Sequence, residues 1–174
     1  PLVNEQTEES TLKIRDIRLD DKLRSPEYQV DGFSTQPGRK EWFEAAVYYE
    51  TDPEWIDELE FTYYFLVRAE ERDDQPYIVF SGTVAYIDVP EGRHKATAYL
   101  HPHTVMRYGD VERVGVEIKF RGRLVARQSE PEAGGQAWWE RLPPRAGYVL
   151  NRKQTPFAFI NVDEYDAIKT EAAR

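Results

Sequence analysis

The histidines are the first residues to consider for chemistry, because imidazole can ligate a metal or act as a general base. The chain has only three, His94, His101 and His103. The last two are separated by one residue, so their rings can lie on one side, near Asp88 or Glu91. A metal site needs three or four convergent ligands, and this spacing guarantees only two. We therefore interpret the histidines as surface residues and predict no metal site.

Trp138 and Trp139 are adjacent in a segment rich in glycine and proline. An exposed indole ring can stack on a sugar or insert into a partner's pocket. Alternatively, at least one of the two rings plugs the open end of a β-sandwich, since burial of so large an apolar surface is favourable. We favour the plug, and we keep both tryptophans as candidate contacts with a partner or a glycan.

Three basic side chains, Arg113, Lys119 and Arg121, fall on one face of an expected β-hairpin. They can meet an acidic partner. They can also simply discourage edge-to-edge aggregation of the sheet. We include them among the candidate partner contacts.

Catalytic signatures are absent from the sequence. None of the five serines lies in a Gly-x-Ser-x-Gly setting, and there is no phosphate-binding glycine loop and no His-Glu-x-x-His pair. The acidic runs at 52–58 and 70–74 do not have the spacing of an EF-hand loop, so we interpret them as solvated charge. We predict no catalytic residue and no cofactor.

Composition narrows the class of protein further. The 174 residues carry a net charge of −9, which disfavours nucleic-acid binding, and the lack of cysteine excludes disulfides and thiolate metal sites. No apolar run reaches the ~18 residues that a membrane span needs. The sequence begins Pro1-Leu2-Val3 rather than with Met, which suggests that an upstream segment, for example a signal peptide, has been removed. We expect an extracytoplasmic location in a bacterium: periplasm, outer-membrane surface or cell surface.

The segment 111–129 gives the clearest structural pattern. Apolar residues alternate with polar ones up to Phe120, as in a strand with one buried face. Gly122 interrupts the run and apolar residues then resume, which predicts a hairpin. A three-residue loop at 121–123 would place Phe120 opposite Leu124 and Glu117 opposite Arg127. We favour this register because two-residue turns would place charge on the core face.

Similar strand patterns recur along the chain. A phase change within 11–19 indicates either a β-bulge or a strand that switches sheets, and further strands are expected at 42–51, 55–69, 77–89, 93–101, 148–150 and 157–162. Turns are expected at 52–54 and 90–92, and a short helical turn at 136–142. We predict an all-β, antiparallel sandwich of immunoglobulin-like type with about 7–9 strands, and a jelly roll or closed barrel as the alternative. Residues 1–10 would be a flexible leader, 11–162 the sandwich, and 163–174 a terminal tail or short helix.

Three segments carry a family resemblance: Val114-Gly115-Val116-Glu117-Ile118-Lys119-Phe120, the return Leu124-Val125-Ala126, and the tail Thr155-Pro156-Phe157-Ala158-Phe159-Ile160. The chain resembles immunoglobulin-like bacterial surface proteins, in particular those encoded alongside type IV pilus components in some mucosal bacteria. The resemblance implies an exported, disulfide-free sandwich without known catalysis, acting in pilus-related assembly or host contact. It assigns no site residue.

Our leading prediction is therefore a non-enzymatic, exported interaction module that contacts a protein partner in a type IV pilus or cell-envelope assembly. A carbohydrate-binding module that uses Trp138 and Trp139 is the alternative, and a small jelly-roll hydrolase is a further one.

Overall fold

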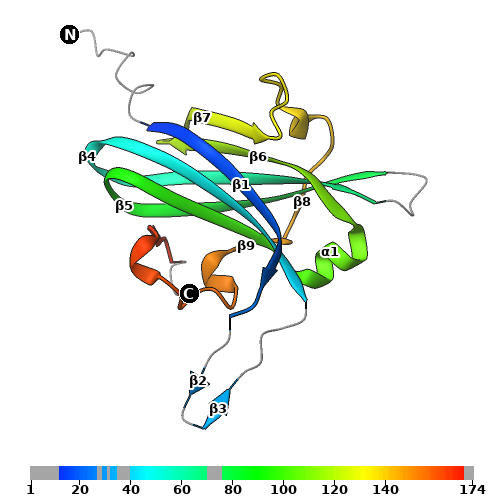
Figure 1. Cartoon of the computed structure of the whole chain (residues 1–174). Coiled ribbons are helices and arrows are strands. Elements are labelled where there is room, and N and C mark those ends of the chain that lie inside the picture. Colours follow the sequence, from blue (N-terminus) through cyan, green and yellow to red (C-terminus); the bar gives the residue numbers. More distant parts are fainter. Residues whose placement is uncertain (1–11, 27–28, 31, 35–39, 70–75, 171–174) are drawn as a thin grey trace, which may run out of the picture.

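The chain folds mainly into β-strands (Figure 1). The computed structural model describes residues 12–26, 29–30, 32–34, 40–69 and 76–170. Its main strands are β1 (Leu12–Arg24), β4 (Glu41–Arg68), β5 (Tyr77–Leu100), β6 (Asp110–Phe120) and β7 (Arg123–Glu130). Short strands are β2 (Gln29–Val30), β3 (Phe33–Ser34), β8 (Arg145–Ala146), β9 (Val149–Asn151) and β10 (Ala167–Ile168). Among the described residues, the helices are α1 (Pro102–Tyr108) and the 3₁₀ turns Trp138–Glu140, Arg152–Gln154 and Val162–Glu164.

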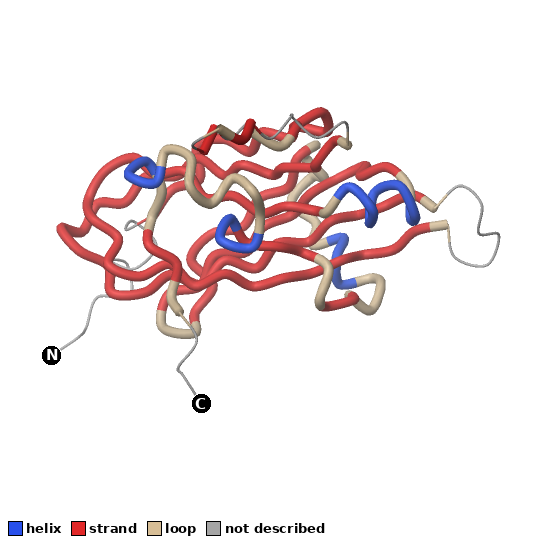
Figure 2. Tube along the Cα trace, turned by 90° about the horizontal axis from the view of Figure 1, so that it is seen from below, coloured by secondary structure: helices blue, strands red, loops and turns tan. Residues whose placement is uncertain are grey.

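A long hairpin of β4 and β5 is the frame of the molecule and runs along its length (Figure 2). Residues 43–51 pair with 92–100, and residues 55–68 pair with 77–90. β1 extends the first half of this hairpin, whereas β6 and then β7 extend the second half. The two halves therefore form the two layers of a sandwich-like, predominantly antiparallel all-β fold, as the sequence predicts.

The expected turns at 52–54 and 90–92 are bends within continuous strands rather than ends of strands. The pairing of β4 with β5 shifts register between Thr51 and Trp55, and β5 continues through Pro90 to Leu100. A proline disrupts the regular hydrogen-bond ladder of a sheet but is accommodated at a bulge. Pro53 therefore lies where the hairpin bends, and β4 and β5 stay paired on both sides of it. The four strands expected in this region are therefore two long ones.

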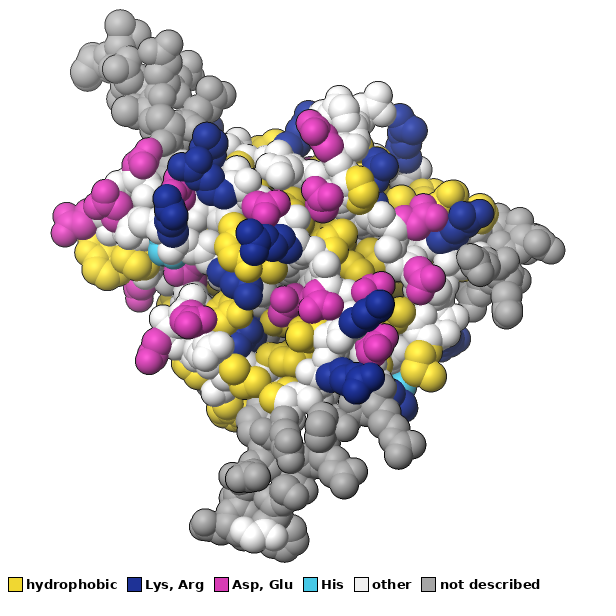
Figure 3. All heavy atoms as spheres, in the orientation of Figure 1, with side chains coloured by type: hydrophobic (Ala, Val, Ile, Leu, Met, Phe, Trp, Pro, Cys, Tyr) yellow, Lys and Arg dark blue, Asp and Glu magenta, His cyan; other side chains and the backbone are white. Residues whose placement is uncertain are grey.

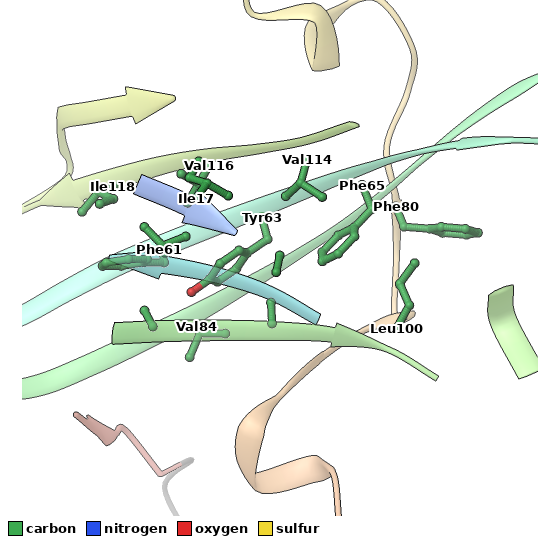
Figure 4. Close-up of a cluster of buried hydrophobic side chains, with 14 of the residues drawn as sticks. Ile17, Phe61, Tyr63, Phe65, Phe80, Val84, Leu100, Val114, Val116 and Ile118 are labelled. Carbon is green, nitrogen blue, oxygen red and sulfur yellow. The ribbon is translucent and has the colours of Figure 1, made fainter. Parts of the chain in front are cut away.

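The hydrophobic core lies between the two layers (Figure 4). One layer contributes residues such as Ile17 and Leu100, which are 2% and 0% exposed. The facing layer contributes aromatic and β-branched side chains that alternate with outward residues, as the period of two requires. These fully buried side chains are Phe61, Tyr63, Phe65, Phe80, Val114, Val116 and Ile118.

The β6–β7 hairpin has the predicted pairing at its base but a different turn. Glu117 faces Arg127 as predicted, but Phe120 faces Arg123, not Leu124. Arg121 and Gly122 both have positive φ, 50° and 76°, and form a two-residue turn. A register shift between Ile118 and Lys119 restores the inward alternation of apolar side chains. A β-bulge therefore keeps the apolar residues on the core face, which the three-residue loop was expected to do.

Two further expectations are confirmed by the structure, and the expected strand near the C-terminus is wrong. The phase change in 11–19 is confirmed by a register shift between Ile14 and Asp16, and the helical turn expected at 136–142 is the 3₁₀ turn Trp138–Glu140. The expected strand at 157–162 is wrong, because this segment forms turns. Within the expected tail or short helix at 163–174, residues 163–164 belong to the 3₁₀ turn Val162–Glu164 and Ala167–Ile168 form β10, which pairs with β5; residues 171–174 lie outside the described part. The leader 1–10 lies outside the described residues.

Candidate binding sites

Trp139 lies on the outer face of the layer formed by β4 and β6, not at the open end of the sandwich. It is 4% exposed, stacks on Tyr64 with ring centroids 5.2 Å apart, and donates from Nε1 to Glu117 Oε1 at 2.7 Å. Gly115 makes this contact possible, because a Cβ there would lie 2.5 Å from the indole ring. The expected burial of a tryptophan is therefore correct, and its expected location is wrong.

Trp138 is half-buried beside Trp139, in an edge-to-face contact with centroids 5.3 Å apart. Its Nε1 donates to Ser129 Oγ at 2.9 Å. Next to the pair, a pocket of about 400 Å³ is lined by Trp139, Tyr64, Glu117 and the segment 140–144. A glycan contact stays a prediction, and it now concerns Trp138, since the ring of Trp139 is covered.

The basic side chains named from the sequence belong to the same region. Arg113 and Lys119 pair with Leu66 and Glu60 of β4, and they flank Gly115 and Glu117 at alternate positions of β6. Arg121 lies in the exposed turn, with its guanidinium 4.9 Å from the Phe120 ring centroid. The structure thus gathers the sequence-predicted contact residues around the β6–β7 hairpin.

The histidines lie in two different places. His101 and His103 have ring centroids 4.7 Å apart at the start of α1, where His101 Nδ1 accepts the backbone N–H of His103. Burial, together with the nearby His103 and Lys40, lowers the pKa of His101. Within the described ranges, no three His, Asp or Glu side chains are grouped as metal ligands would be.

His94 instead belongs to a buried hydrogen-bond network that sequence reasoning missed. Its Nδ1 lies 2.9 Å from Asp166 Oδ1, and its Nε2 lies 2.7 Å from the carbonyl oxygen of Pro90. The Tyr49 hydroxyl donates to Asp166 Oδ2 at 2.5 Å, and the Tyr49 ring stacks on His94. Since both ring nitrogens face acceptors, the geometry favours the imidazolium form.

The pKa values in this network follow from burial and from Asp166. Burial by itself lowers the pKa of His94, but the hydrogen bond and charge of Asp166, aided by the Pro90 carbonyl, outweigh it and raise the pKa. Burial and the same carboxylate raise the pKa of Tyr49 far above its ordinary value. The network therefore pairs Asp166 with a histidine whose charged form is favoured and with a tyrosine that stays neutral.

A pocket of about 310 Å³ opens beside this network, between β5 and the C-terminal segment. Tyr86 and Thr97 of β5 form one wall. Most of the other lining residues are apolar or aromatic and come from the segment that ends in β10: Ala158, Val162, Tyr165, Ala167 and Ile168. Hydrophobic side chains gather on this part of the surface (Figure 3).

Two buried polar side chains in the pocket wall lack partners for some of their atoms. Arg152 is 8% exposed and donates from Nη1 to the Tyr99 hydroxyl at 3.2 Å, and from Nη2 to the Ile160 carbonyl. Its Nε has no hydrogen-bond partner, and neither does the Oγ1 of Thr97, which is 2% exposed. Among the described residues, no carboxylate forms an ion pair with Arg152.

This pocket could not be read from the sequence. Its walls come from Tyr86 and Thr97 of β5 and from residues between 152 and 168, and the sequence predicts a strand at 157–162 and a tail or short helix from 163. The only local signal is an apolar tail segment, 157–160, that includes the exposed Phe159.

The fold is an all-β, sandwich-like sheet with a cavity under its C-terminal segment. A protein-family model matches residues 3–172, so this chain belongs to that family over nearly its full length. The crystal structure of a protein from Akkermansia muciniphila is similar, with a TM-score of 0.77 and 24% sequence identity. The match covers 93% of this chain and 94% of that chain and shows a shared fold. No curated protein matches the sequence significantly.

Within the described residues, none of the helices is long and apolar enough to cross a membrane.

Proposed function

We propose that this chain is a non-enzymatic, exported module that binds a protein partner in the bacterial cell envelope. The observation that carries the proposal is the exposed apolar surface next to the C-terminal pocket. Phe159 is 81% exposed and Val162, which lines the pocket, is 59% exposed. Large apolar side chains beside an apolar cavity are typical of an interaction surface rather than of solvent-facing structure.

The state of His94 supports a non-enzymatic role. A general base needs a free nitrogen within reach of a substrate. Both nitrogens of His94 are committed to acceptors inside the protein, and its side chain is 7% exposed. The His94–Asp166 pair therefore serves structure, although its residue types are those of a catalytic dyad.

The envelope location and a role in type IV pilus assembly come from the family resemblance. The segments 114–120, 124–126 and 155–160 resemble exported immunoglobulin-like proteins encoded with pilus components, and 157–160 contains the exposed Phe159. We place the partner contact at this last segment, which we call the C-terminal surface and define as Phe159, Val162 and the pocket beside them.

Site-specific photo-cross-linking in the native bacterium tests the proposal. A benzoylphenylalanine replaces Phe159, and the matched control places it at Met106 of α1, which is 71% exposed. We expect one envelope protein to cross-link at position 159 and not at 106, and Val162→Asp to abolish the product without lowering the melting temperature.

Equal labelling at both positions, or no product at either, would contradict the proposed surface. The same probe at Arg121 tests the basic hairpin. Cross-linking there alone would move the interface from the C-terminal surface to the β6–β7 hairpin.

A further inference from the structure

The described residues that line the C-terminal pocket include two cations and one carboxylate, although the protein as a whole carries −9. Arg152 and Lys153 both line the pocket. Among the described residues, the only carboxylate in the lining is Asp166, which already faces His94 and the Tyr49 hydroxyl. The remaining titratable lining groups are Tyr86 and Tyr165. The balance of charge therefore favours an anionic group in the pocket.

Arg152 indicates where in the pocket an anionic group would bind. A buried guanidinium that forms no ion pair is costly, because its charge has lost contact with water. Two of its nitrogens already have neutral oxygen acceptors, and Nε has none. The Tyr165 ring lies over the face of the guanidinium, with its centroid 3.5 Å from the central carbon.

We propose that this pocket binds the carboxylate of an apolar ligand, with Arg152 as its cation and Thr97 as a second hydrogen-bond partner. One oxygen accepts from Arg152 Nε–H and the other from the Thr97 hydroxyl. The apolar part of the ligand contacts residues such as Ala158 and Ile168. A volume of about 310 Å³ fits one large side chain with its carboxylate.

Two unused donors match the two oxygens of a carboxylate. A phosphate would leave further charged oxygens unpaired against an apolar wall, which is unfavourable. The chemistry has two sources, a free carboxylic acid or the C-terminal residue of a partner protein. The inference deepens the proposed function by naming what the partner presents to the pocket.

Calorimetric titration with three probes tests the inference and separates the two sources. The probes are N-acetylphenylalanine, its amide, and 4-phenylbutyrate. We expect N-acetylphenylalanine to bind at least tenfold more tightly than its amide. If 4-phenylbutyrate binds equally well, the acid alone is recognised. If it binds more weakly, the peptide C-terminus is the ligand. Failure of both acids to bind, or equal binding of the amide, overturns the inference.

Variants place the ligand in the pocket. Ala158→Leu fills the cavity without removing any side-chain hydrogen bond, and we expect it to abolish acid binding with the melting temperature unchanged. Ala146→Leu in β8, an exposed alanine outside the pocket lining, is the matched control and should bind normally. Arg152→Gln should weaken the binding of N-acetylphenylalanine and leave the affinity for its amide unchanged. Unaltered acid binding by Ala158→Leu would contradict the assigned site.

The outcomes also separate this inference from the proposed function. If the acids do not bind but Phe159 still cross-links to an envelope protein, the proposed interaction surface stands and the proposed carboxylate binding in the pocket is wrong. If the acids bind and Phe159 cross-links nothing, the pocket serves a free small molecule and the protein partner is wrong.

Discussion

His94 of β5 and Asp166, which directly precedes β10, lie 2.9 Å apart through Nδ1 and Oδ1, with each side chain 7% exposed. The second carboxylate oxygen accepts the hydroxyl of Tyr49 from β4. One carboxylate thus joins both strands of the central hairpin to the C-terminal segment. Because that segment forms most of the pocket, the His94–Asp166 pair is the main polar anchor of the candidate site.

Stability should fall as the pH rises through the folded pKa of His94. That pKa is raised above the unfolded value of about 6.5, so the folded protein holds a proton that the unfolded chain loses. The stabilisation that the raised pKa of His94 gives the folded state is therefore complete below about pH 6.5 and is lost above the folded pKa. Urea unfolding from pH 6 to 9 measures this. His94→Gln should flatten the slope, and an unchanged slope in that variant would contradict the assignment.

Asp166→Asn should destabilise the fold and lower the pKa of His94. The change keeps the size of the side chain but removes the charge that the buried imidazolium faces, and the loss should be about 3 kcal/mol in the free energy of unfolding. NMR titration of the His94 ring checks the pKa. Asp163→Asn, at an exposed position of the same segment, serves as the control and should change neither quantity.

Gly115→Ala should destabilise the protein through the Trp139 ring. The added Cβ would lie 2.5 Å from two ring carbons, so the indole must leave Tyr64 and Glu117. We expect a loss of about 1–3 kcal/mol. The double variant Gly115→Ala with Trp139→Ala should show less than the sum of the single losses. Full additivity in denaturant titrations would mean that the two sites do not contact each other.

Phe65→Ala should cost about 3–5 kcal/mol of stability, since it leaves a cavity in the middle of the core. Phe65 is 0% exposed and meets Phe43 edge-on, with centroids 5.8 Å apart. Phe159→Ala removes the same side chain from a position that is 81% exposed and should change stability by less than about 0.5 kcal/mol. Similar losses for the two variants would be inconsistent with the assigned core.

Much of the layered fold could be predicted from local patterns. The alternation through Val114, Val116 and Ile118 identifies a strand with one buried face, and all three side chains are 0% exposed. The pairing of Glu117 with Arg127 followed from matching polar with polar across the hairpin. The turn itself was predicted wrongly, because a bulge between Ile118 and Lys119 changes the count of residues without changing the apolar pattern.

The sequence by itself determined the class of fold, since a period of two along a strand depends only on neighbouring residues. Tertiary structure decided the candidate site. Whether Pro53 ends a strand or bends it depends on how the two layers close over the core. Asp166, Arg152 and Thr97 are far apart in the chain and have no local pattern of their own. They meet only because the C-terminal segment returns to the edge of β5, and burial there gives each of them its chemistry.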